Sequence, residues 1–149
     1  YESHIGVLAH IAQLNASESQ IYVILEDDVM LAPHWRSALN KTLALLPSDW
    51  SLLRCNVRYP NPQMQIAPGV FRANRTLRHF HGMHFVVTTP LRAARVLRKL
   101  SMAPLDDIDV MCNTDAFGSY VTSDGHGLQV IVPFATRLTS FMAGHSDHG

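Results

Sequence analysis

The chain has 149 residues, enough for one compact domain with a hydrophobic core and too few for two domains of ordinary size. Its 12 basic and 12 acidic residues balance, so the composition gives no support to nucleic-acid binding through bulk electrostatics. No apolar run approaches the roughly 20 residues that cross a bilayer, and no transmembrane segment is expected in this chain.

The first half of the chain alternates between helical and strand patterns. Residues 3–14 carry apolar side chains near helical spacing, with Ser3 available as an N-cap. The apolar run 21–25 suits a strand buried on both faces. Residues 34–46 return to helical spacing, and residues 49–57 resemble a second short strand.

The second half begins with a proline-rich segment and then resumes the alternation. Residues 59–69 contain three prolines and predict a long surface loop. A strand is expected within 80–89, and a basic helix over 90–100 has its cations towards the C-terminal turn. Further strands are expected near 119–122 and 128–133. This order predicts an α/β layer structure that binds its ligand beyond the carboxyl ends of the strands.

The two cysteines and three glycosylation triplets bear on the compartment. Cys55 and Cys112 are far apart and fit no zinc spacing, so buried free thiols are favoured and a disulfide is the alternative. Asn-x-Ser/Thr triplets begin at Asn15, Asn40 and Asn74 and favour a secretory lumen, although Asn40 lies in an expected helix.

Three consecutive carboxylates, Glu26, Asp27 and Asp28, follow the apolar strand 21–25. In a partly dehydrated site their mutual repulsion would raise their pKa values or destabilise the fold unless a cation is present. Oxygen ligands select hard ions such as Mn²⁺ or Mg²⁺. Alternate residues of a strand share a face, so Glu26 and Asp28 can point together while Asp27 points away. The alternative is a plain strand-to-loop exit in which Asp28 caps a turn.

The order of segments resembles glycosyltransferase family 25, the group of lipooligosaccharide and collagen-type sugar transferases. The segment LEDDV, residues 25–29, is the specific part of this resemblance. The other matching segments, in the same order, are Ser3-His4, the Trp35 helix, PSDWSLLR at 47–54, HGMHFVVTTPLRAARVL at 81–97, PLDD at 104–107 and VIVPF at 130–134.

The resemblance implies a GT-A fold, a Rossmann-like three-layer sandwich with a mixed central sheet. In it an acidic motif holds Mn²⁺ or Mg²⁺ against the diphosphate of a nucleotide-sugar donor. Carried over to this chain, Glu26 and Asp28 are the metal and donor ligands, and Asp27 contacts the ribose or the sugar. Ser3 and His4 contact the donor or the acceptor. The family's N-terminal strand–helix unit, which binds the nucleotide base, is expected to be missing here.

The resemblance also implies a catalytic base and a late metal ligand. An inverting transfer needs a base for the acceptor hydroxyl, and Asp106 or Asp107, in the family's P-x-D position, is the candidate. Helix capping is the alternative role for this acidic cluster. A late histidine completes the metal shell in many enzymes of this fold, which makes His145 and His148 candidates.

Other histidines and arginines admit both functional and ordinary roles. Isolated histidines are more often satisfied polar residues than ligands, and this applies to His79, His81 and His84. A group of arginines flanks the proline-rich segment and offers contacts to a diphosphate or an anionic acceptor, although a solvated surface strip is the commoner explanation. Its members are Arg54, Arg58, Arg72, Arg75 and Arg78.

The expected function is metal-dependent, inverting transfer of a hexose, galactose or glucose, from a nucleotide sugar such as a UDP-hexose to a glycan or glycoprotein. A metal-dependent phosphoester hydrolase built on a two-ion site is one alternative. A non-catalytic sugar- or nucleotide-binding remnant of a transferase is another. The family acts in the lumen of the ER or Golgi in its collagen-type branch and at the cytoplasmic side in its bacterial branch, so the compartment stays open.

Overall fold

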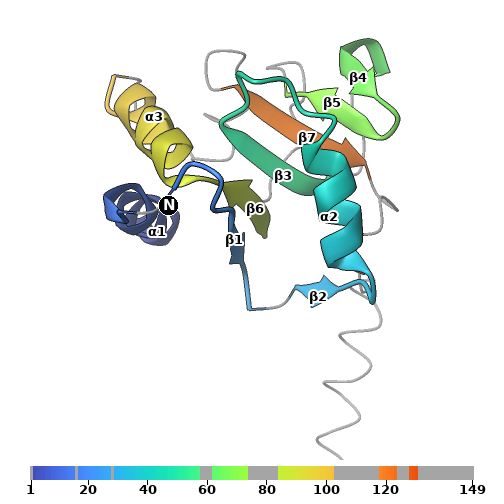
Figure 1. The fold of residues 1–149 in the computed structure, drawn as a ribbon, viewed down its shortest axis with the longest axis horizontal. Coiled ribbons are helices and arrows are strands. Elements are labelled where there is room, and N and C mark those ends of the chain that lie inside the picture. The colour runs from blue at the N-terminus through green and yellow to red at the C-terminus, as the bar shows by residue number, and fades with distance from the viewer. Residues whose placement is uncertain are drawn as a thin grey trace, which may run out of the picture.

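The computed structural model describes residues 2–15, 17–27, 29–57, 62–73, 84–102, 118–123 and 128–130. These residues form helices and short strands, and several strands follow one another directly in the chain (Figure 1). The helices are α1 (Glu2–Gln13), α2 (Trp35–Leu43), α3 (Pro90–Leu100) and a 3₁₀ turn at Pro62–Met64. The strands are β1 (Tyr22–Leu25), β2 (Met30–Leu31), β3 (Leu52–Val57), β4 (Gln65–Ala67), β5 (Val70–Arg72), β6 (Phe85–Thr88), β7 (Ser119–Ser123) and β8 (Gln129–Val130).

The main sheet is mixed and has the strand order β1-β6-β3-β7-β5-β4, and β2 pairs with β8 in a separate two-stranded sheet. Strand β6 runs antiparallel to both β1 and β3, whereas β3 and β7 are parallel. Strands β1, β3 and β7 therefore end at the same side of the sheet, where β6 begins; we call this side the carboxyl edge. The expected α/β class with a mixed sheet is confirmed.

Helices cover both faces of the sheet (Figure 1). Helices α1 and α3 pack side by side on one face, where Leu8 and Val96 meet Leu52 and Val86 in one buried cluster. Helix α2 covers the other face in a second cluster, to which β3 contributes Leu53. Successive residues of a strand point to opposite faces, so the apolar run of β3 supplies both clusters.

The local sequence explains why α3 begins where it does. Thr89 is extended, and its side chain accepts a hydrogen bond from the Arg92 backbone N–H at 3.4 Å, while Pro90 occupies the first turn. Ala93, Val96 and Leu100 then recur at helical spacing and are buried against the sheet. The expected helix over 90–100 is confirmed.

The expected loop over 59–69 was wrong in its second half, where β4 and β5 form a hairpin. Ala67 pairs with Val70, so Pro68 and Gly69 form a two-residue turn. Gly69 has a φ of 70°, a conformation that glycine adopts without steric cost. Proline followed by glycine favours such a turn, so these residues mark a change of direction between two strands.

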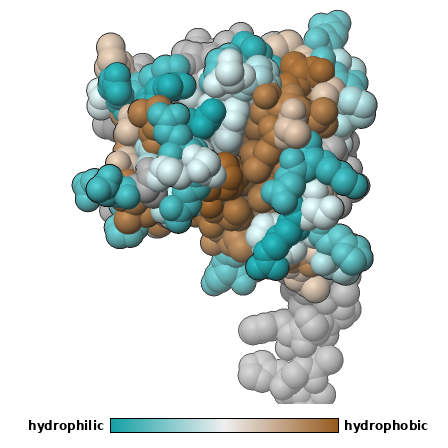
Figure 2. All heavy atoms as spheres, viewed as in Figure 1, coloured by the Kyte–Doolittle hydropathy of each residue, from teal (hydrophilic) through white to brown (hydrophobic). Residues whose placement is uncertain are grey.

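Strand β1 lies at the border of the described sheet, with β6 as its neighbour there. Its side chains reach both core clusters, since Ile24 packs with α1 and α3 and Val23 packs with α2. Leu25 and Ile21 nevertheless remain 41% and 37% exposed. Figure 2 shows apolar side chains gathered at this part of the surface, between the α1–α3 pair and α2. The expectation of a strand buried on both faces was therefore only partly right.

None of the helices within the described ranges is long and apolar enough to span a membrane.

Candidate functional site

Glu26 lies at the carboxyl edge, directly after β1. Its backbone N–H donates to the His84 carbonyl oxygen at 3.0 Å, which extends the β1–β6 ladder beyond the Leu25–Phe85 pair. Glu26 follows Ile24 by two positions and so points to the face covered by α1 and α3. The two-residue period of the strand explains this orientation, because it places Glu26 on the same face as Ile24, the last apolar residue there.

Two imidazoles face the Glu26 carboxylate from other elements of the fold. The Nδ1 atom of His84, just before β6, lies 3.3 Å from Oε2. The Nε2 atom of His4, in the first turns of α1, lies 3.8 Å from Oε1. The side chains of Glu26 and His84 are 38% and 37% exposed, and that of His4 is 16% exposed. Each oxygen of the carboxylate thus has one imidazole nitrogen nearby, and the side chain stays partly exposed to solvent.

This arrangement suits a carboxylate that receives a positively charged partner. An ionised carboxylate has about four lone-pair sites, so two imidazole contacts leave acceptor sites for a cation. The N-terminal end of α1, where His4 lies, carries the positive end of the helix dipole and favours a nearby negative charge.

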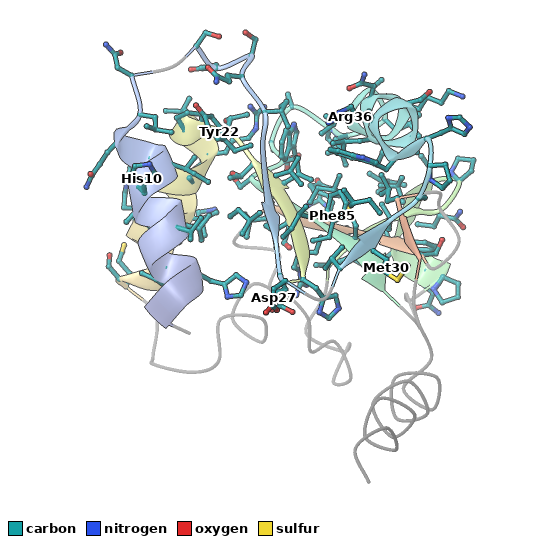
Figure 3. All side chains as sticks on the ribbon, turned by 90° about the horizontal axis from the view of Figure 1, so that it is seen from below. His10, Tyr22, Asp27, Met30, Arg36 and Phe85 are labelled. Carbon is teal, nitrogen blue, oxygen red and sulfur yellow. The ribbon has the colours of Figure 1, made fainter. Side chains whose placement is uncertain are left out.

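The structure describes only some of the other residues that are expected to bind the nucleotide-sugar donor. Asp27 is exposed at the end of β1 (Figure 3), and its expected contact with the ribose or the sugar stays a prediction. The backbone of Ser3 belongs to α1, and its side chain is not among those that the structure describes. Asp28 is also outside the described residues. The structure thus brings together His4 and Glu26 of the expected set.

The expected catalytic and late metal-binding residues all fall outside the described part of the chain. These are Asp106, Asp107, His145 and His148, and their roles remain predictions. Among the residues that the structure does describe, no group of three or more histidine, cysteine, aspartate or glutamate side chains is arranged to hold a metal ion. The donor types at Glu26 and its neighbours, a carboxylate and imidazoles, are nevertheless those that divalent metals use in proteins.

His84 is the site residue whose placement the sequence did not indicate. The sequence offers it, with His79 and His81, as a satisfied polar residue or a metal ligand, and His79 and His81 lie outside the described residues. Its position opposite Glu26 follows from the antiparallel pairing of Leu25 with Phe85. Only a correct assignment of this register could have identified the contact from the sequence.

The expected arginine strip is not supported by its two described members. Arg54 is only 1% exposed and lies within β3, so it is a core residue rather than part of a solvated surface. Arg72 lies at the side of the sheet opposite to the carboxyl edge, where its Nη2 atom is 3.5 Å from Oδ2 of Asp49. Arg72 therefore has a local carboxylate partner, far along the strands from Glu26. Arg58, Arg75 and Arg78 are outside the described residues.

Comparisons of this chain with protein-family models, with curated proteins and with solved structures found no match.

Proposed function

We propose that this chain is a metal-dependent glycosyltransferase domain that transfers a hexose, with inversion, from a nucleotide-sugar donor to a glycan or glycoprotein. The observation that carries the proposal is the Glu26 carboxylate at the carboxyl edge of an α/β sheet, faced by His4 and His84. Ligands of open α/β sheets bind beyond this edge. The proposal is supported by the partial exposure of this carboxylate, which allows a cation to bridge it to the phosphates of a donor.

Glu26 and Asp28 are the proposed ligands of Mn²⁺ or Mg²⁺, with His145 or His148 completing the shell. The carboxylate of Glu26 fits this role because its oxygens are hard donors and its side chain reaches solvent. A divalent cation in this position supplies Lewis-acid stabilisation of the charge that develops on the departing nucleoside diphosphate.

The remaining proposed roles belong to groups that bind substrate or move a proton. Asp27, exposed beside Glu26, contacts the ribose or the sugar of the donor. Ser3 and His4, at the start of α1, contact the donor or the acceptor. Asp106 or Asp107 accepts the proton of the attacking acceptor hydroxyl, as an inverting transfer requires of a base across the cleft.

Calorimetric titration of UDP in the presence of Mn²⁺, repeated with EDTA, tests the proposal. We expect heat of binding with Mn²⁺ that disappears with EDTA and in the Asp28→Asn variant. Glu18→Gln is the matched control, because Glu18 is an exposed carboxylate in the segment between α1 and β1 and should leave binding unchanged. UDP binding that ignores the metal would favour a non-catalytic remnant. No binding in either buffer would contradict the donor site.

A further inference from the structure

His84 restrains Glu26 through both its main chain and its ring. Its carbonyl oxygen accepts the backbone N–H of Glu26 at 3.0 Å, and its Nδ1 atom lies 3.3 Å from Oε2 of the same residue. The first contact fixes where the Glu26 side chain begins, and the second limits where its carboxylate can turn. A glutamate side chain has several rotatable bonds, so without the ring the carboxylate would sample more rotamers.

His4 is the weaker of the two imidazole neighbours. Its Nε2 atom lies 3.8 Å from Oε1, which exceeds an ordinary N–H···O hydrogen-bond distance, whereas the His84 contact is only slightly longer than that range. The two histidines therefore differ in what they do for Glu26. His84 lies close to Oε2 of the carboxylate, and His4 lies farther away, beside Oε1.

The identity of the facing nitrogen gives this contact a chemical signature. A carboxylate oxygen accepts hydrogen bonds, so an imidazole nitrogen can hold it only when that nitrogen carries the hydrogen. In His84 this is Nδ1, the ring nitrogen nearer the backbone. An asparagine amide N–H can occupy a place close to that of Nδ1, whereas a glutamine amide extends towards the place of Nε2. Substitutions at one position can therefore separate the functions of the two nitrogens.

We propose that His84 is a positioning residue for the metal site: it holds the Glu26 carboxylate, through Nδ1, in the orientation in which that group binds the divalent cation. This inference rests on the metal-dependent function proposed for the chain. Carboxylates that bind metals are themselves held by hydrogen bonds from surrounding residues, and loss of such a partner typically weakens metal affinity by about 10–100-fold. His84 is the described residue whose geometry fits that task.

The test is Mn²⁺ affinity, measured by electron paramagnetic resonance of the free ion, for the unchanged chain and a set of variants. We expect His84→Ala to weaken Mn²⁺ binding about ten-fold or more, within the range known for such partners. His84→Asn should restore most of that loss, and His84→Gln should not. His4→Ala should have a smaller effect than His84→Ala. The control is His10→Ala, an exposed histidine of α1, with unchanged affinity.

Thermal unfolding of each variant separates a positioning role from a purely structural one, because the Asn and Gln variants should melt alike while differing in affinity. His84→Asn binding Mn²⁺ as weakly as His84→Ala would overturn the proposal, and recovery of affinity in His84→Gln instead would indicate a role for Nε2. Unchanged affinity in His84→Ala would overturn it as well, leaving the metal-dependent function standing. Absence of Mn²⁺ binding by the unchanged chain would instead overturn the proposed function, and this inference with it.

Discussion

The hydroxyl of Tyr120 donates a hydrogen bond of 3.0 Å to Oδ1 of Asp49, joining the start of β7 to the segment before β3. Arg72 completes the group, with its guanidinium 5.4 Å from the centre of the Tyr120 ring. Burial of the phenol is the main reason that the pKa of Tyr120 is raised to about 12, and the hydrogen bond to Asp49 adds to it. This group ties β5 and β7 to the segment before β3, at the side of the sheet opposite to Glu26.

The raised pKa of Tyr120 predicts a loss of stability in alkali. In the unfolded chain the phenol titrates near pH 10, so between about pH 10 and 12 the folded protein keeps a proton that the unfolded chain has lost. This contribution is fully present below about pH 10 and declines as the pH rises to about 12, by up to about 1.4 kcal/mol per pH unit. Urea unfolding at several pH values should show a shallower decline for Tyr120→Phe. Equal slopes in the two proteins would contradict the prediction.

Substitution by alanine should have opposite effects on stability at Gly118 and at Gly6. Gly118 has a φ of 56°, and a Cβ there would lie 2.5 Å from the carbonyl oxygen of Asp49. We expect Gly118→Ala to lower the free energy of unfolding by about 2 kcal/mol or more, from backbone strain and the clash together. Gly6, in α1, has open space around it, so Gly6→Ala should raise stability by about 0.5–1 kcal/mol. Denaturant unfolding of both variants measures the difference in sign.

Cys55 is a free thiol that should be inert in the folded protein. It is buried in β3, and this burial raises the pKa of its thiol far above the ordinary value. In a Cys112→Ser background, an aromatic disulfide reagent at pH 8 should detect no thiol before unfolding and one after the addition of guanidinium. Rapid reaction under native conditions would show that β3 opens or that Cys55 is accessible. The free state of Cys55 agrees with the expected buried thiol, and Cys112 lies outside the described residues.

Truncation of two adjacent residues of α1 should show how much the buried side of this helix contributes to the free energy of unfolding. Leu8 is completely buried in the cluster beneath α1 and α3, whereas Val7 is 41% exposed. Leu8→Ala should cost about 2–5 kcal/mol, because it removes apolar contacts and leaves a cavity. Val7→Ala should change stability by less than about 0.5 kcal/mol. Similar losses for both would mean that the exposed side of α1 is also covered.

Sequence reasoning succeeded where the pattern was long and local. The helix over 90–100 has a cap, an early proline and an apolar stripe, and these signals act within a few residues. The β4–β5 hairpin was missed because its strands are only three residues each, too short to show a period. The border position of β1 and the approach of His84 depend on strand order and register, which arise from contacts between distant segments. The periodicity of a single sequence does not reveal strand order or register.

The pairing of β1 with β6 also has a consequence for how the chain folds. Tyr22 pairs with Thr88, so α1 and β1 pack against β6 and α3. In the sequence these two units are separated by the segments that form β2, α2, β3, β4 and β5. Contacts of such large sequence separation slow folding, because the intervening loop must close before they form. Since this docking also brings His84 to Glu26, a refolding chain should acquire the geometry of its candidate site at that slow step, and not earlier.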